Sequence, residues 1–285
     1  MKLKIRRFPM NEVLRKKPGS IILLLGKRGS GKSCMMIEIA KQLYEAGNID
    51  IAVGMSPTDE SNKTLSSFLP QTLIYPEFKE SIVEKIMQQQ KKQIKEKGPE
   101  GAKRVFLFLD DCGYDSKLIF NSKVMKRLFY NGRHSKIGLV MALQYAIDMP
   151  VSFRANCDIC ITMRETIYSN RERLYKQYFG QFSSMKSFGM AMDACTADYS
   201  SLVSCTNLHN NSNELTDSVF WYKAKIDHEP FILGSSAVKR MDRQCYDDVE
   251  AQIEEEKKKR EAELNRSEVN RVVRGDEDGK TAKLR

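Results

Sequence analysis

The feature that most constrains this chain is a short apolar run that stops at a glycine and continues into small and basic residues, LLLGKRGSGKSCM at positions 23–35. Four residues fit the spacing Gly-x-x-x-x-Gly-Lys-[Ser/Thr], with one further glycine inside the loop. Glycines let backbone N–H groups curl around a phosphate, the lysine reaches its outer oxygens, and the serine hydroxyl is placed to bind Mg²⁺. The predicted phosphate loop consists of Gly26, Lys27, Arg28, Gly29, Ser30, Gly31, Lys32, Ser33 and Cys34.

The residues on either side of this loop support the same prediction. Residues 21–25 are an unbroken apolar run typical of a buried parallel strand, and residues 33–46 have apolar side chains at helical spacing. A phosphate would then lie at the N-terminus of a helix, where free N–H groups and the helix dipole favour an anion. The alternative is a chance glycine-rich turn, which a strand before the loop and a helix after it disfavour.

The rest of the chain alternates between predicted strands and helices. Strands are expected at residues 49–54, 71–75, 105–109, 137–143 and 158–163, and helices at residues 77–97 and 117–130. This alternation predicts an α/β fold with a mostly parallel central sheet flanked by helices. Ligands of such sheets bind beyond the carboxyl ends of the strands.

The net charge indicates the kind of binding partner, and the cysteine content indicates the cellular compartment. The net charge is +10, and residues 247–285 carry 12 acidic and 10 basic side chains, so the preceding part of the chain has a charge of +12. A basic body is compatible with a polyanionic partner.

Seven scattered cysteines favour free thiols inside a cell, and we interpret Cys157 and Cys160 as core residues rather than as a zinc or redox pair. We expect neither a signal sequence nor a membrane span, which needs roughly 20 apolar residues.

Two carboxylates follow the apolar strand expected at residues 105–109. Asp110 is expected to hold Mg²⁺ together with Ser33, opposite the phosphate loop. Asp111 comes one residue later and could act as the general base that polarises an attacking water. The alternative is a turn and helix cap without a catalytic role.

Three more polar residues are candidates for the same chemistry. Gln144 ends an otherwise apolar strand and could sense the γ-phosphate and orient water, or it could simply reach solvent. Arg133 precedes that strand at a helix end, where it could complete a neighbouring subunit's site or cap helix carbonyls. Arg154 is the competing candidate for the first of these roles.

Residues 163–182 interleave basic and aromatic side chains. This pattern fits stacking on nucleic acid, but the apolar residues recur at helical spacing, so we favour an amphipathic helix whose aromatic face packs inward.

The motifs GKRGSGKS, FLFLDD, NGRHSKIGLVMALQY and FRANCDICITMRE together resemble the DNA-packaging ATPases of large nucleocytoplasmic DNA viruses, a branch of the FtsK/HerA group of P-loop motors. The likeness runs from about residue 21 to residue 165. It implies a RecA-like P-loop fold of the additional-strand catalytic type, with ATP and Mg²⁺ as ligands. It also implies a homo-oligomeric ring, a pentamer or a hexamer, that translocates double-stranded DNA into a capsid.

The resemblance assigns roles to particular residues. Gly26 to Ser33 would be the phosphate loop, Asp110 the magnesium acid, Gln144 the sensor, and Arg133 the arginine that precedes the sensor strand. Asp111 stands where cellular members usually have a glutamate, so its shorter side chain must bring the carboxylate closer to the water.

We therefore expect a basic segment at residues 1–18, a P-loop ATPase domain at residues 19–245, and a charged tail at residues 246–285, a frayed helix followed by disorder. The expected localisation is the viral assembly site in the host cytoplasm, or the virion, with capsid or virion membrane proteins as further partners.

The alternative function is a P-loop nucleoside or small-molecule kinase, which also pairs a phosphate loop with strand-end acids but has no role for Gln144. A GTP switch would need an Asn-Lys-x-Asp motif, which the sequence lacks.

Overall fold

A computed structural model describes residues 4–17, 19–113, 116–145, 149–205, 214–246, 257, 259–260, 273–275 and 281–283. The chain divides into two units, Met1–Ser235 and Ser236–Arg285. In the second unit, residues 236–246 are helical, and β10 (Val273–Gly275) pairs antiparallel with β11 (Thr281–Lys283). Most of the tail expected at residues 246–285 lies outside the described residues, so its disorder stays a prediction.

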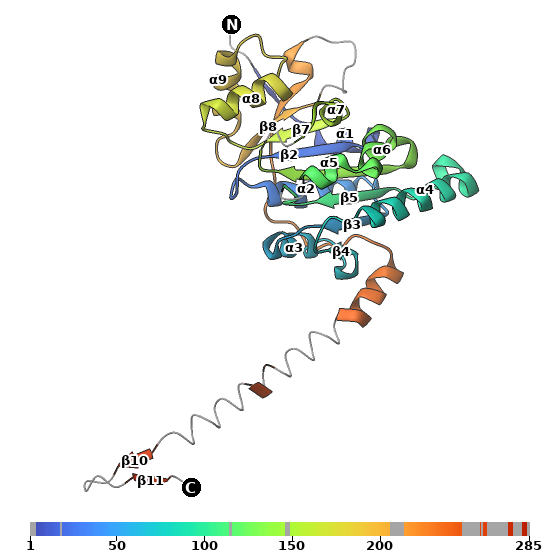
Figure 1. Ribbon diagram of the computed structural model, residues 1–285. Coiled ribbons are helices and arrows are strands. Elements are labelled where there is room, and N and C mark those ends of the chain that lie inside the picture. The colour runs from blue at the N-terminus through green and yellow to red at the C-terminus, as the bar shows by residue number, and fades with distance from the viewer. Residues whose placement is uncertain are drawn as a thin grey trace. The chain divides into compact units, whose positions relative to one another are not determined.

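The first unit is built on a nine-stranded sheet with the strand order β1-β9-β8-β7-β2-β6-β5-β3-β4 (Figure 1). β8 runs antiparallel to both of its neighbours, and every other neighbouring pair is parallel. This confirms the predicted mostly parallel sheet. The strands are β1 (Arg6–Arg7), β2 (Ile21–Leu25), β3 (Ile51–Met55), β4 (Ile74–Tyr75), β5 (Val105–Leu109), β6 (Ile137–Leu143), β7 (Ile159–Thr162), β8 (Ser200–Ser204) and β9 (Val219–Lys223).

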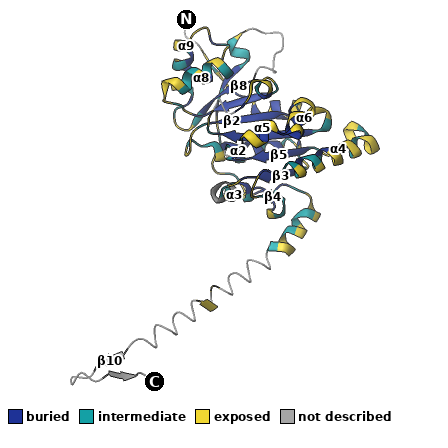
Figure 2. Cartoon of the chain, in the orientation of Figure 1, coloured by how far each residue is buried: buried dark blue, intermediate teal, exposed yellow. Residues whose placement is uncertain are grey.

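Helices cover both faces of this sheet and bury its middle strands. Every residue of β2, β5, β6 and β7 is buried, which explains why their sequences are continuous apolar runs (Figure 2). Along β2, Ile22 and Leu24 belong to one core cluster, and Leu23 and Leu25 to the other, because side chains alternate between the two faces of a strand.

Each cluster is completed by its own set of helices. The cluster with Ile22 and Leu24 includes residues of α1 (Met10–Lys16), α2 (Lys32–Glu45) and α3 (Asp59–Ser66). The other includes residues of α4 (Glu80–Gly101), α5 (Ser116–Asn121), α6 (Lys123–Asn131), α7 (Val151–Arg154), α8 (Tyr168–Tyr178) and α9 (Met185–Cys195). Short 3₁₀ helices are η1 (Gln71–Leu73), η2 (Arg133–Ser135) and η4 (Leu215–Asp217).

Residues of the basic segment expected at positions 1–18 pack within the first unit. β1 pairs with β9, and the ring of Phe8 lies 5.4 Å from that of Phe220, centroid to centroid. Val13 and Leu14 of α1 are fully buried. The apolar residues between the charges therefore belong to the core. The expected boundaries at residues 18 and 245 stay predictions.

Three expected elements differ in detail. Residues 71–75 form η1 followed by the two-residue strand β4. The helix expected at residues 117–130 is split, because Ser122 caps α6 by accepting a hydrogen bond from the N–H of Met125 at 3.0 Å. α4 continues past its expected end to Gly101, with a kink at Gly98, where φ is 74°.

The cysteines expected in the core lie there. Cys160 is buried, and Cys157 packs against the same cluster. Burial raises the pKa of the Cys157 thiol to about 12, so this thiol stays protonated at neutral pH and is a weak nucleophile. All seven cysteines of the chain are free thiols.

A buried carboxylate ties α2, the helix behind the phosphate loop, to the sheet. Glu38 is fully buried, and it accepts a hydrogen bond from the hydroxyl of Tyr222 on β9. Nε2 of His228 lies 2.9 Å from its second oxygen. Burial is the main cause that raises the pKa of Tyr222, which keeps the hydroxyl a donor. The contacts of Tyr222 and His228 with Glu38 thus hold α2 in position.

Candidate active site

The loop between β2 and α2 has the geometry that a phosphate needs. Gly31 precedes α2 with φ 98° and ψ 12°, a left-handed conformation that favours glycine. α2, which the structure describes along its whole length, has neither a side-chain cap nor an acidic residue in its first turn. The N–H groups of that turn can therefore bind an anion, which the helix dipole also attracts.

Position 26 requires glycine because a side chain there would clash with its neighbours. A Cβ built on it would lie 2.6 Å from Oγ of Ser30 and 2.8 Å from Cβ of Met163. Its N–H donates to the carbonyl of Leu143 at 3.2 Å, which fixes the start of the loop to the end of β6. Nζ of Lys32 donates to the carbonyl of Gly26 at 2.5 Å and to that of Lys27 at 3.0 Å, so the ammonium group lies over the loop.

The register of β5 on β6 brings the two predicted acids to the same edge of the sheet. Leu109 pairs with Met141, so Asp110 and Asp111 follow β5 beside the last residues of β6. Oδ1 of Asp111 accepts a hydrogen bond from Nε2 of Gln144 at 2.7 Å. Asp111 has φ 50°, and a non-glycine residue held in this region is typical of functional sites.

Lys32 of the phosphate loop interacts electrostatically with both aspartates. Asp110 is only 3% exposed. Burial lowers the pKa of Lys32, and the carboxylates of Asp110 and Asp111 oppose that shift. The structure thus brings together the loop, both aspartates and Gln144, which sequence analysis placed in one site.

Arg133 lies at the opposite edge of the sheet. Its guanidinium pairs with the carboxylate of Asp158, which is buried and also accepts the N–H of Ile21 at 2.9 Å. Arg133 precedes β6 and the loop contacts the end of β6, so the seven residues of this strand, at about 3.3 Å each, separate them by about 20 Å. Within one chain, Arg133 therefore does not reach the phosphate loop.

Arg154 is held by contacts within the chain. Its guanidinium donates to the carbonyl of Met149 at 2.7 Å and to Oε1 of Gln177 at 3.3 Å, and it lies 5.8 Å from the ring centroid of Tyr178. The side chain of Arg133, by contrast, is 56% exposed. Of these two arginines, Arg133 is exposed and Arg154 is half-buried.

The aromatic and basic segment at residues 163–182 contains α8. Leu174 and Tyr178 are buried in the core, as is Phe179 just after the helix. The hydroxyl of Tyr175 donates to the carbonyl of Phe182 at 3.2 Å. The inward packing of these side chains confirms the amphipathic helix.

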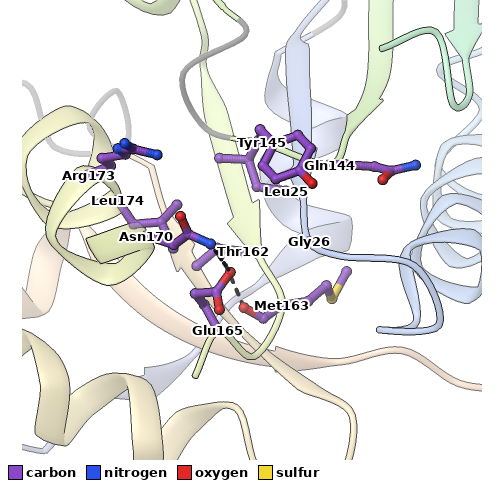
Figure 3. A pocket seen from close by; sticks show the side chains of 10 residues that line it. All are labelled: Leu25, Gly26, Gln144, Tyr145, Thr162, Met163, Glu165, Asn170, Arg173 and Leu174. Atoms are coloured by element: carbon purple, nitrogen blue, oxygen red, sulfur yellow. Dashed lines mark hydrogen bonds between the residues drawn. The ribbon is translucent and has the colours of Figure 1, made fainter. Parts of the chain in front are cut away.

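The phosphate loop also has neighbours that sequence analysis missed. On one side is a cavity of 20 Å³ (Figure 3), where Tyr145 and Arg173 lie on opposite sides and Gln144 points away from α8. On the other side is a cavity of 330 Å³ lined by Lys27, Gly29, Ser30, Arg164, Thr166, Thr196, Asp198, Tyr199 and Ser200. The residues after 190 come close only through the antiparallel pairing of β8, for which the sequence has no local signal.

Known proteins match this chain over most of the first unit. Residues 6–178 match the profile of the family described as the poxvirus A32 protein. The chain is 34% identical to uncharacterized protein 088R of Invertebrate iridescent virus 3 over 215 residues, which is 74% of this chain and 78% of that relative. It is 27% identical to an uncharacterized protein of Acanthamoeba polyphaga mimivirus over 231 residues, 79% of each chain.

A solved structure has a similar fold. The crystal structure of B204, the DNA-packaging ATPase from Sulfolobus turreted icosahedral virus, matches with a TM-score of 0.51 and 16% identity over 74% of this chain and 100% of B204. This likeness confirms the P-loop ATPase fold. The region that matches the family profile contains the phosphate loop, Asp110, Asp111 and Gln144. The chain belongs to the family of the poxvirus A32 protein.

Proposed function

We propose that this chain hydrolyses ATP and uses the released free energy to package double-stranded DNA into a viral capsid. The observation that carries the proposal is the 2.7 Å contact between Asp111 and Gln144, formed at the edge of the sheet where Lys32 lies over the phosphate loop. The proposal is supported by the family and by the fold of B204, which is itself a DNA-packaging ATPase.

The residues at this edge fit a triphosphate and Mg²⁺. The first turn of α2 offers N–H groups, and the ammonium of Lys32 is within reach of the outer phosphates. The hydroxyl of Ser33 and the buried carboxylate of Asp110 are oxygen donors, which Mg²⁺ prefers. When bound, Mg²⁺ would neutralise charge that develops on the phosphate oxygens.

We assign the role of general base to Asp111. It would accept a proton from water while the water oxygen bonds to the γ-phosphorus and the bond from that phosphorus to the bridging oxygen breaks. The products are ADP and inorganic phosphate, and Asp111 then passes its proton to solvent. Gln144 donates to one carboxylate oxygen, which orients the other for the water.

We expect long duplex DNA to stimulate ATP hydrolysis by the wild-type chain severalfold. A basic body that contacts phosphates binds DNA with a strong salt dependence, so the DNA concentration for half stimulation should rise steeply, about 10³-fold or more, between 50 and 200 mM salt. The measurement is phosphate release at several salt concentrations, with and without DNA. Phosphate transfer to a nucleoside, with no response to DNA, would favour the kinase instead.

A ring of subunits would let Arg133 act on the neighbouring site. In Arg133→Lys, the ammonium can still pair with Asp158, so the fold should survive. An ammonium does not replace a planar guanidinium, and we expect the ATPase activity of the assembly to fall about 10³-fold. Thermal unfolding checks the fold, and phosphate release checks the activity.

Mixing two inactive variants tests whether Arg133 acts between subunits. The intact phosphate loop of an Arg133→Lys subunit can receive Arg133 from a Lys32→Ala subunit, so mixed assemblies should regain activity. No recovery in mixed assemblies of normal stability would rule out this role.

The proposed workplace is the viral assembly site, with capsid or virion membrane proteins as partners. Among the described residues, no helix combines the length and the apolar character that crossing a bilayer requires.

A further inference from the structure

The two cavities beside the phosphate loop differ in what they can hold. The cavity between Tyr145 and Arg173 has 20 Å³, enough for a single water (Figure 3). The cavity on the other side has 330 Å³, which is within the range of about 300–1,000 Å³ for small-ligand pockets. Between these two, only the larger has room for a nucleobase.

The order of the strands also indicates that the base lies on the side of β2 where β7 and β8 are. Asp111 follows β5 and Gln144 follows β6, and both strands lie on one side of β2. The γ-phosphate would therefore lie on this β6 and β5 side. A triphosphate that lies along the loop from there extends its base toward β7 and β8, on the other side of β2. β8 runs against β7, with Leu202 paired to Thr162, so the residues just before β8 lie where β7 ends.

Tyr199, the last residue before β8, has an unusual conformation there. It has φ 58°, and Asp198 before it has φ 50°, so two successive non-glycine residues are in the left-handed region. Such a conformation is unfavourable for residues with side chains and persists where the surroundings enforce it. Core packing does not explain it, because Tyr199 is 72% exposed.

The ring of Tyr199 is close to the loop. A Cβ built on Gly31 would lie 3.7 Å from Cδ1 of Tyr199, which is van der Waals contact. Lys27, Gly29 and Ser30 line the same cavity as this ring. An exposed aromatic ring beside a phosphate loop is a surface on which a base can stack.

We propose that Tyr199 stacks on the purine base of the bound nucleotide. This inference rests on the proposed ATPase function and adds the residue that holds the base. Every base has an aromatic face, so the stack should favour ATP and GTP alike and distinguish both from ligands that have no base.

The test is calorimetric binding of AMPPCP, a non-hydrolysable ATP analogue, and of inorganic tripolyphosphate. Tyr199→Ala should bind AMPPCP about 5- to 140-fold more weakly, the range of a single base–aromatic stack, and bind tripolyphosphate as the wild type does. Tyr199→Phe keeps the ring and should keep the affinity. Tyr130→Ala is the matched control, since Tyr130 is 57% exposed at the end of α6 that precedes β6, at the opposite edge of the sheet.

The possible outcomes separate this inference from the proposed function. If Tyr199→Ala binds AMPPCP as tightly as the wild type, the stack is wrong and the ATPase proposal stands. If it loses AMPPCP and tripolyphosphate equally, Tyr199 supports the loop instead of the base, which also overturns the stack. If the wild-type chain binds neither ligand, both the proposed function and the inference are overturned.

Discussion

Asp111→Asn should lower ATP turnover about 10²- to 10⁴-fold, the contribution typical of a general base, and leave ATP affinity nearly unchanged. Asparagine has the shape of aspartate and can still accept the hydrogen bond from Nε2 of Gln144. The variant therefore loses the charge and the basicity and keeps the arrangement of the site. Single-turnover hydrolysis measures the chemical step, and equilibrium binding of AMPPCP measures the affinity.

Asp227→Asn is a suitable control for this experiment. Asp227 is exposed, and its replacement makes the same change in net charge. If Asp111→Asn hydrolyses ATP at the wild-type rate, Asp111 is not the base, and the water must be activated by another group.

Lys32→Ala should abolish both tight nucleotide binding and turnover. Loss of one group that stabilises transition-state charge lowers turnover about 10²- to 10³-fold, and the loss of ground-state phosphate contacts lowers kcat/KM further. We expect little change in the free energy of unfolding, because the desolvation that lowers the pKa of the ammonium offsets its hydrogen bonds to Gly26 and Lys27. Calorimetry with tripolyphosphate, phosphate release and urea denaturation measure the three quantities.

Lys95→Ala removes an exposed lysine from α4 and controls for the lost charge. Tripolyphosphate binding of wild-type strength in Lys32→Ala would contradict the role of Lys32 in holding the outer phosphates.

The central part of the fold was predictable because its signals are local. The apolar runs of β2, β5 and β6 are each buried on both faces, so period and hydropathy alone identify them. Parallel strands end at a common edge, which is why Gly26, Asp110 and Gln144 could be placed together before their distances were known.

What the sequence did not reveal depends on pairing between distant residues. β1 is only two residues long and joins the sheet through Phe220 and Trp221, more than two hundred positions away. The basic residues around it suggested a separate segment. Likewise, Asp158 is an ordinary residue before a strand until the fold brings Arg133 and the N–H of Ile21 to its carboxylate.

The reversed direction of β8 separates the residue proposed to hold the base from the residues proposed to act on the γ-phosphate. The residues that would act on the γ-phosphate lie on connections after parallel strands and fall within positions 6–178, which match the family profile. Tyr199 lies beyond them, on the connection into the one strand of the main sheet that runs backwards. Substitutions in the α9–β8 connection should thus change the affinity for the nucleotide and leave the proposed hydrolytic residues in place.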